Sequence, residues 1–160
     1  MAVSPNPKEN AQLVRVQVES GSWRPRFSGQ IDLGVAGGFE LAAYRGTVYV
    51  VAQRAGESLT VDAVDVTRSS IRKLVSFPGT EGVKLQSCAI IPLKGDAHLL
   101  VHYTVDLRHV FSVLNPRDLQ IEELDVSPHR DEVVEVLWDA AGGACLVNLS
   151  SGRLRRLRPT

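Results

Sequence analysis

The sequence has few of the residues on which several classes of protein depend. Its 160 residues include two cysteines, Cys88 and Cys145, which are too few for a disulfide framework or a zinc cluster and are expected to be reduced structural thiols. No apolar run approaches the roughly 18 residues of a membrane-spanning helix. No apolar segment follows a basic start, as it does in a secretion signal. We therefore expect an intracellular protein, cytoplasmic or nuclear, without a membrane partner.

Excess charge and catalytic motifs are also missing. Eighteen Lys+Arg balance eighteen Asp+Glu, so the bulk charge does not indicate a nucleic acid or an anionic surface as the main partner. The chain contains no Gly-x-Ser-x-Gly elbow, Walker loop or Gly-x-Gly-x-x-Gly sequence. The prediction is a protein that is not an enzyme and that needs no cofactor.

What the chain does contain is an internal period of about 48 residues, the length of one four-stranded β-propeller blade. Val18, Val66 and Leu114 each end a strand-like run before a turn, and they are evenly spaced along the chain. A second series of landmarks agrees, because Gly46, Gly95 and Gly143 precede apolar runs at nearly the same spacing. Because the two series of residues have nearly the same spacing, they indicate a repeated structural unit.

Within each period the sequence favours short strands. Val14, Val16 and Val18 alternate with polar residues, which is typical of a half-buried strand, and β-branched residues recur through the later runs. A chain of this length is expected to fold around one core. The expected strands are residues 13–18 and 23–31, then 40–44, 47–53, 59–66 and 70–75, then 87–91, 97–103, 107–114 and 119–124, and finally 133–138, 144–149 and 153–157.

These groups of four short strands resemble blades of the broad kelch and WD-repeat type, over roughly residues 13–158. Trp138-Asp139 is similar to the pair that ends a WD repeat, although its register places it at the first turn of a unit, so the resemblance is to propellers in general. It implies an all-β fold with about three four-stranded antiparallel sheets of a partial β-propeller; the alternative is a β-sandwich. Residues 11–160 would form this propeller-like repeat domain, behind a disordered N-terminal arm at residues 1–10.

An array of about three blades is smaller than a closed propeller, which has about four to eight. Its two end sheets would leave unpaired edges, and something must cover them. We expect the strand at residues 13–18 to pair with the strands at 133–157, either within the chain or across a dimer.

The histidines and carboxylates do not predict a metal or catalytic site. His98 and His102 share a strand but lie about 13 Å apart along it, and no acidic or thiol residue lies near His109 or His129 at metal-ligand spacing. Asp62 and Asp65 project from opposite faces of one strand, so they cannot share a proton. All are expected to be ordinary surface or partly buried residues.

The C-terminus is the most basic segment. Arg153, Arg155 and Arg156 alternate with leucines, and such a strand edge could bind phosphates. No aromatic residue is interleaved with them. We therefore expect an exposed final strand whose arginines pair with acidic Glu122, Glu123 and Asp125, and nucleic acid is the less favoured partner.

The function that these features favour is a non-catalytic protein–protein interaction scaffold, or a subunit of a larger complex, whose partners are other chains or a second copy. This follows from the resemblance, since propellers without catalytic groups serve as platforms for recognition. The alternatives are a small-ligand-binding or enzymatic propeller domain and a nucleic-acid-associated subunit. The candidate partner-binding residues are Tyr44, Arg45, Tyr103, Arg153, Arg155 and Arg156.

Overall fold

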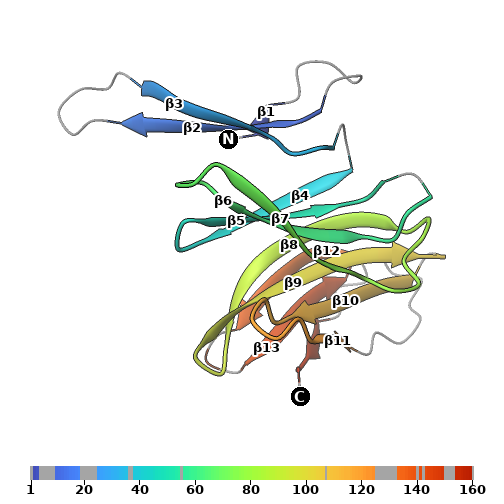
Figure 1. The fold of residues 1–160 in the computed structure, drawn as a ribbon. Coiled ribbons are helices and arrows are strands. Elements are labelled where there is room, and N and C mark those ends of the chain that lie inside the picture. The colour runs from blue at the N-terminus through green and yellow to red at the C-terminus, as the bar shows by residue number, and fades with distance from the viewer. Residues whose placement is uncertain are drawn as a thin grey trace.

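A computed structural model describes residues 2–3, 10–18, 25–35, 38–54, 56–106, 108–124, 133–139, 141, 143–149 and 154–159. These residues form an all-β fold, as predicted, and their strands assemble into four antiparallel sheets. The described part of the chain holds no helix with the length and apolar character that a membrane crossing requires. The sheets follow one another in chain order and are stacked from the N-terminal end of the molecule to the C-terminal end (Figure 1).

Each sheet is a simple meander of consecutive strands. The first sheet contains β1 (Ala2–Val3), β2 (Gln12–Val18) and β3 (Pro25–Asp32). The second contains β4 (Phe39–Tyr44), β5 (Thr47–Ala52), β6 (Thr60–Asp65) and β7 (Ser70–Ser76). The third contains β8 (Lys84–Leu93), β9 (Asp96–Val105), β10 (Arg108–Leu114) and β11 (Ile121–Leu124). The fourth contains β12 (Val133–Asp139), β13 (Ala144–Leu149) and β14 (Leu154–Leu157).

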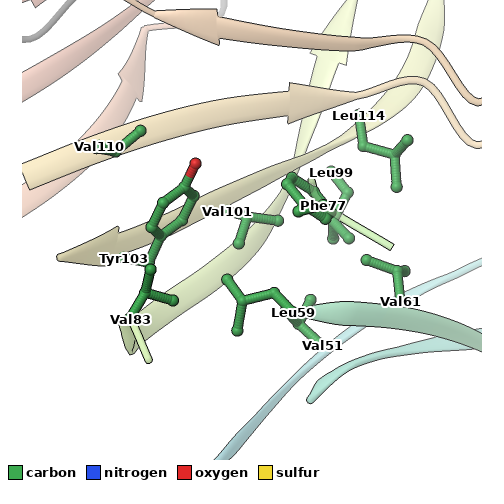
Figure 2. Close-up of a cluster of buried hydrophobic side chains, with 10 residues drawn as sticks. All are labelled: Val51, Leu59, Val61, Phe77, Val83, Leu99, Val101, Tyr103, Val110 and Leu114. Atoms are coloured by element: carbon green, nitrogen blue, oxygen red, sulfur yellow. The ribbon is translucent and has the colours of Figure 1, made fainter. Parts of the chain in front are cut away.

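The apolar core is divided into three clusters, one between each pair of consecutive sheets, so the prediction of a single core is wrong. The cluster between the second and third sheets is drawn in Figure 2 and contains Val51, Leu59, Val61, Phe77, Val83, Leu99, Val101, Tyr103, Val110 and Leu114. Leu13, Leu33 and Val50 belong to the cluster between the first two sheets, and Phe111, Cys145 and Leu157 to the one between the last two. The arrangement of four layers with three interfaces also differs from the alternative fold, a β-sandwich of two sheets.

The two middle sheets each pack against a neighbouring sheet on both faces. In β9, Leu99 and Val101 point toward the second sheet, whereas Leu100 points toward the fourth. In β5, Val51 points toward the third sheet and Val50 toward the first. Successive side chains of a strand project to opposite faces, so burial of both faces requires an uninterrupted apolar run. This explains why β5 and β9 lack the alternation of polar and apolar residues seen at residues 13–18.

The two ends of the array do not pair with each other in this chain. β2 pairs with β1 and β3, while β12, β13 and β14 pair among themselves. The expected pairing of residues 13–18 with residues 133–157 within one chain is therefore wrong. Two residues of the expected N-terminal arm, Ala2–Val3, form β1 against β2, and residues 4–9 of that arm lie outside the described residues.

Two hairpins of the middle sheets turn in the same way. Arg45-Gly46 connects β4 to β5, and Lys94-Gly95 connects β8 to β9. The φ angles are 46° and 81° in the first turn and 51° and 81° in the second. Positive φ at both central residues is the signature of the type I′ turn, which matches the twist of the strands that it joins.

Replacing Gly46 or Gly95 with valine should therefore destabilise the protein by similar amounts, about 1–2 kcal/mol each, because a β-branched residue is strained at positive φ. A Cβ at either position would meet no atom within 4 Å, so the cost is conformational and not steric contact with a neighbour. Urea unfolding measures the change, with Gly29→Val in β3 as a control at a glycine without positive φ. A silent substitution at one turn beside complete unfolding at the other would contradict the equivalence of the two hairpins.

Candidate functional site

The first pair of predicted partner-binding residues lies in the β4–β5 hairpin. Tyr44 is partly exposed at the end of β4, and Arg45 is exposed in the turn. The Arg45 guanidinium carbon is 5.1 Å from the centroid of the Tyr44 ring, within the range of a cation–π contact. The hairpin thus presents an aromatic ring and a cation to solvent as one unit.

Tyr103 does not belong to this surface, and its prediction as a partner-binding anchor is corrected by the structure. Its side chain is 4% exposed, and its ring meets Phe77 edge-on with centroids 6.5 Å apart. Its hydroxyl lies 3.4 Å from Ser112 Oγ, toward β10 (Figure 2). Burial raises the pKa of this phenol. The reason for the error is that β9 continues to Val105, so Tyr103 lies inside a strand that is buried on both faces and not at its end.

The structure describes two of the three C-terminal arginines that are predicted to bind a partner. Arg153 lies outside the described residues, and Arg155 is a β14 residue that pairs with Val147 of β13. The exposed Arg156 forms an ion pair with Asp139, with Nη2 and Oδ2 3.1 Å apart.

The acidic partner of Arg156 is therefore in β12 of the same sheet. It is not Glu122 or Glu123 of the third sheet, because β14 joins the sheet of β12 and β13. Asp125, the third expected partner, lies outside the described residues.

Two neighbouring pockets lie where the turns of the second and third sheets approach each other. One has a volume of about 440 Å³ and includes Tyr49, Asp65, Arg68 and Arg72 in its lining. The other has a volume of about 180 Å³ and lies at the Tyr44–Arg45 hairpin and at the start of β9, which carries Asp96. The two share residues and form one continuous surface, here called the basic groove, which is lined by Tyr44, Arg45, Tyr49, Asp65, Arg68, Arg72, Asp96, Pro116 and Arg117.

Tyrosine and arginine side chains set the chemistry of the basic groove. Burial raises the pKa of the Tyr49 phenol, and the nearby Arg72 charge partly opposes that change. Arg117 Nη2 lies 3.1 Å from Asp96 Oδ1, and Arg68 Nε lies 3.8 Å from Asp65 Oδ2. The groove therefore contains phenol hydroxyls and guanidinium groups, which donate hydrogen bonds to oxygen acceptors. The sequence indicates Tyr44 and Arg45 but not the other members of the groove, because these come from several separate turns and strands.

The structure also brings together two histidines from neighbouring strands, a contact that the sequence does not predict. His102 Nε2 of β9 and His109 Nδ1 of β10 are 3.0 Å apart, and the His102 ring stacks on Phe111 with centroids 4.3 Å apart. Burial, with a smaller contribution from His109, lowers the pKa of His102 to about 4. His102 is therefore neutral near pH 7 and shares a hydrogen bond with His109. The register of the β9–β10 hairpin places His102 opposite Phe111, two residues from His109 on the same face of β10. A correct prediction of this register would have placed the two histidines side by side.

This histidine pair does not extend into a larger ligand set within the described part of the chain. No group of three or more His, Cys, Asp or Glu side chains there is arranged to hold a metal ion, and His129 lies outside the described residues. The pair is packed against an aromatic ring in the core between the third and fourth sheets. Its chemistry in this arrangement is that of a part-buried hydrogen bond between two imidazole rings.

The cysteines are unpaired, as expected, and their surroundings make them poor nucleophiles. Burial raises the pKa of the Cys88 thiol to about 12, with a smaller contribution from the Glu40 charge, and that of Cys145 to about 11. Burial also raises the pKa of Glu40 in β4. The thiolate is the reactive form of cysteine, so both thiols remain unreactive near neutral pH.

Neither protein-family models nor curated proteins show a match to this chain.

Proposed function

We propose that this chain is a non-catalytic protein-interaction subunit whose four sheets are blades of an open, propeller-like array that another chain completes. The observation that carries the proposal is the outer face of the fourth sheet. Leu137 of β12 is 53% exposed and Leu154 of β14 is 67% exposed, more than the other large apolar side chains found exposed among the described residues.

These two leucines lie on one face of the fourth sheet. Leu137 pairs with Leu146 of β13, and Leu146 pairs with Arg156 of β14. Leu154 is two residues before Arg156, so it projects to the same face. The opposite face packs against the third sheet through Cys145, Val147 and Leu157. The outer face, defined here by Leu137, Leu146, Leu154 and Arg156, therefore has an apolar centre beside the Arg156–Asp139 ion pair.

The same side of the preceding sheets is covered. Val51 of β5 points from the second sheet to the third, and Leu100 of β9 points from the third to the fourth. The outer face of the fourth sheet continues this series without a following sheet from the described part of this chain. Exposed apolar faces of this kind mark sites of protein–protein interaction.

A second copy is the occupant that we propose. Two chains together supply eight sheets, within the range of about four to eight blades in closed propellers. In such a ring the fourth sheet of each copy would pack against the first sheet of the other, and a two-fold axis would relate the two identical interfaces. A net charge of zero offers little repulsion to this association.

Light scattering of the purified protein tests the proposal. We expect twice the mass of one chain for the wild type, and the mass of one chain for Leu137→Arg/Leu154→Arg, because a charge cannot be buried unpaired in an apolar interface. Ile71→Arg is the matched control: Ile71 is 43% exposed but lies on β7, and this variant should keep the wild-type mass. A wild-type protein that is monomeric and melts cooperatively would refute closure by a second copy.

A further inference from the structure

We propose that the basic groove binds an acidic segment of a partner protein, whose carboxylates pair with Arg45 and Arg72. The inference rests on the proposed function as an interaction subunit. The acidic partner would bind at the junction of the second and third sheets. This surface is separate from the outer face of the fourth sheet.

The charges in the groove do not balance. Four arginines line its two pockets, together with two aspartates. Both aspartates are already engaged, Asp65 by Arg68 and Asp96 by Arg117. Neither Arg45 nor Arg72 forms an ion pair with a carboxylate of the described residues. A ligand that supplies carboxylates would complete the pairing, and a guanidinium binds a carboxylate with two parallel hydrogen bonds.

The tyrosines suit the same ligand. Tyr44 holds the Arg45 guanidinium over its ring, which restricts the orientation of the charge. Tyr49 lines both pockets and keeps its hydroxyl proton at neutral pH, so it can donate to a carboxylate oxygen beside Arg72. Tyrosine and arginine are among the residues that most often dominate the energy of protein–protein contacts.

The shape of the groove favours an extended segment. The pockets of about 440 Å³ and about 180 Å³ both include Tyr49 and Pro116 in their linings, so they adjoin at these two residues. Side chains of an extended peptide that project on the same side can occupy successive pockets of this kind. Asp65 and Asp96 are paired with Arg68 and Arg117, so only two arginines are left for a ligand, and this number suits a short acidic segment better than a continuous phosphate backbone.

A pocket at the corresponding position of the third sheet shows that the fold does not require the basic character. That pocket, of about 500 Å³, is lined in part by residues that lie one repeat period after those of the 440 Å³ pocket. Gln120 takes the place of Arg72, Asp118 that of Ser70, and Glu122 that of Leu74. The third sheet therefore has a pocket at the corresponding place without these arginines. The arginines of the 440 Å³ pocket are not needed to form it.

Fluorescence polarisation with a fluorescein-labelled octa-glutamate peptide tests the inference on the full-length chain. We expect saturable binding to the wild type, weakened about tenfold by Arg72→Gln and about tenfold by Arg45→Gln, since one charge-assisted hydrogen bond is worth about that factor. Glutamine stands at the corresponding position 120, so Arg72→Gln should fold. Arg108→Gln is the matched control, because Arg108 is exposed on β10 and lines neither pocket.

Three results would overturn the inference. The first is equal affinity of the peptide for Arg72→Gln and for the wild type. The second is equal or tighter binding of an octa-lysine peptide. The third is tighter binding of a single-stranded DNA of the same charge, weakened by Arg72→Gln, which would assign the groove to nucleic acid. If any of these occurs while Leu137→Arg/Leu154→Arg still halves the mass, the proposed assembly stands and only the role of the groove is wrong.

Discussion

Replacement of Phe111 with alanine should lower the free energy of unfolding by about 3–5 kcal/mol, the usual cost of removing a fully buried aromatic side chain. Phe111 is 0% exposed and belongs to the cluster between the third and fourth sheets, with Cys145 and Leu157. Its ring also stacks on His102. The substitution therefore opens a cavity at the interface that holds the fourth sheet to the rest of the array.

Urea unfolding monitored by circular dichroism measures this change, with Ser112→Ala as the neighbouring control. Ser112 is also buried, but it projects toward the second sheet, where its hydroxyl makes a long 3.4 Å approach to the Tyr103 hydroxyl. Its removal should cost about 1 kcal/mol. A larger loss for Ser112→Ala than for Phe111→Ala would mean that the two faces of β10 are interchanged.

The protein should lose about 3 kcal/mol of stability as the pH falls from about 6.5 to about 4, because His102 is held neutral in the folded state. Burial, with a smaller contribution from His109, lowers the pKa of His102 from 6.5 to about 4. A tenfold change in an acid dissociation constant corresponds to about 1.4 kcal/mol. Below pH 6.5 the unfolded chain takes up a proton that the folded chain does not. The loss therefore begins near pH 6.5 and is complete near pH 4, below which both states are protonated.

Thermal or urea unfolding between pH 4 and pH 7.5 measures this dependence. In His102→Gln the loss attributable to this histidine should disappear, since the side chain cannot titrate. His98→Gln, on the same strand but outside the pair, should retain the loss. Equal pH profiles for the wild type and His102→Gln would show that protonation of His102 does not limit stability in acid.

The features that the sequence predicted well are those set by neighbouring residues. A type I′ turn depends on the backbone freedom of two adjacent positions, so Arg45-Gly46 and Lys94-Gly95 mark the two hairpins without reference to the rest of the fold. The strands on either side follow from β-branched residues and turn spacing, and the observed bounds lie within a few residues of the expected ones.

Contacts between residues that are far apart in sequence could not be predicted, because distance along the chain does not give distance in space. Residues close in sequence indicate no partner for His102 or His109, but the β9–β10 hairpin folds one histidine back beside the other. The sequence pattern predicts a strand that ends at Tyr103, whereas β9 extends past this residue and buries it between sheets. The basic groove joins Tyr49 and Arg72 to Arg117 from separate segments, and a local pattern cannot show that they meet.

By itself the sequence determined that this chain is all-β, where its strands and turns lie, and that consecutive strands form antiparallel meanders, since these properties depend on side-chain period and turn chemistry within a few residues. The tertiary structure alone decided that four sheets stack with three separate cores, that Leu137 and Leu154 remain exposed at one end, and that arginines and tyrosines converge at the junction of the second and third sheets. The physical reason is that a period of two residues specifies which side chains share a face of a strand but not which neighbouring sheet that face meets.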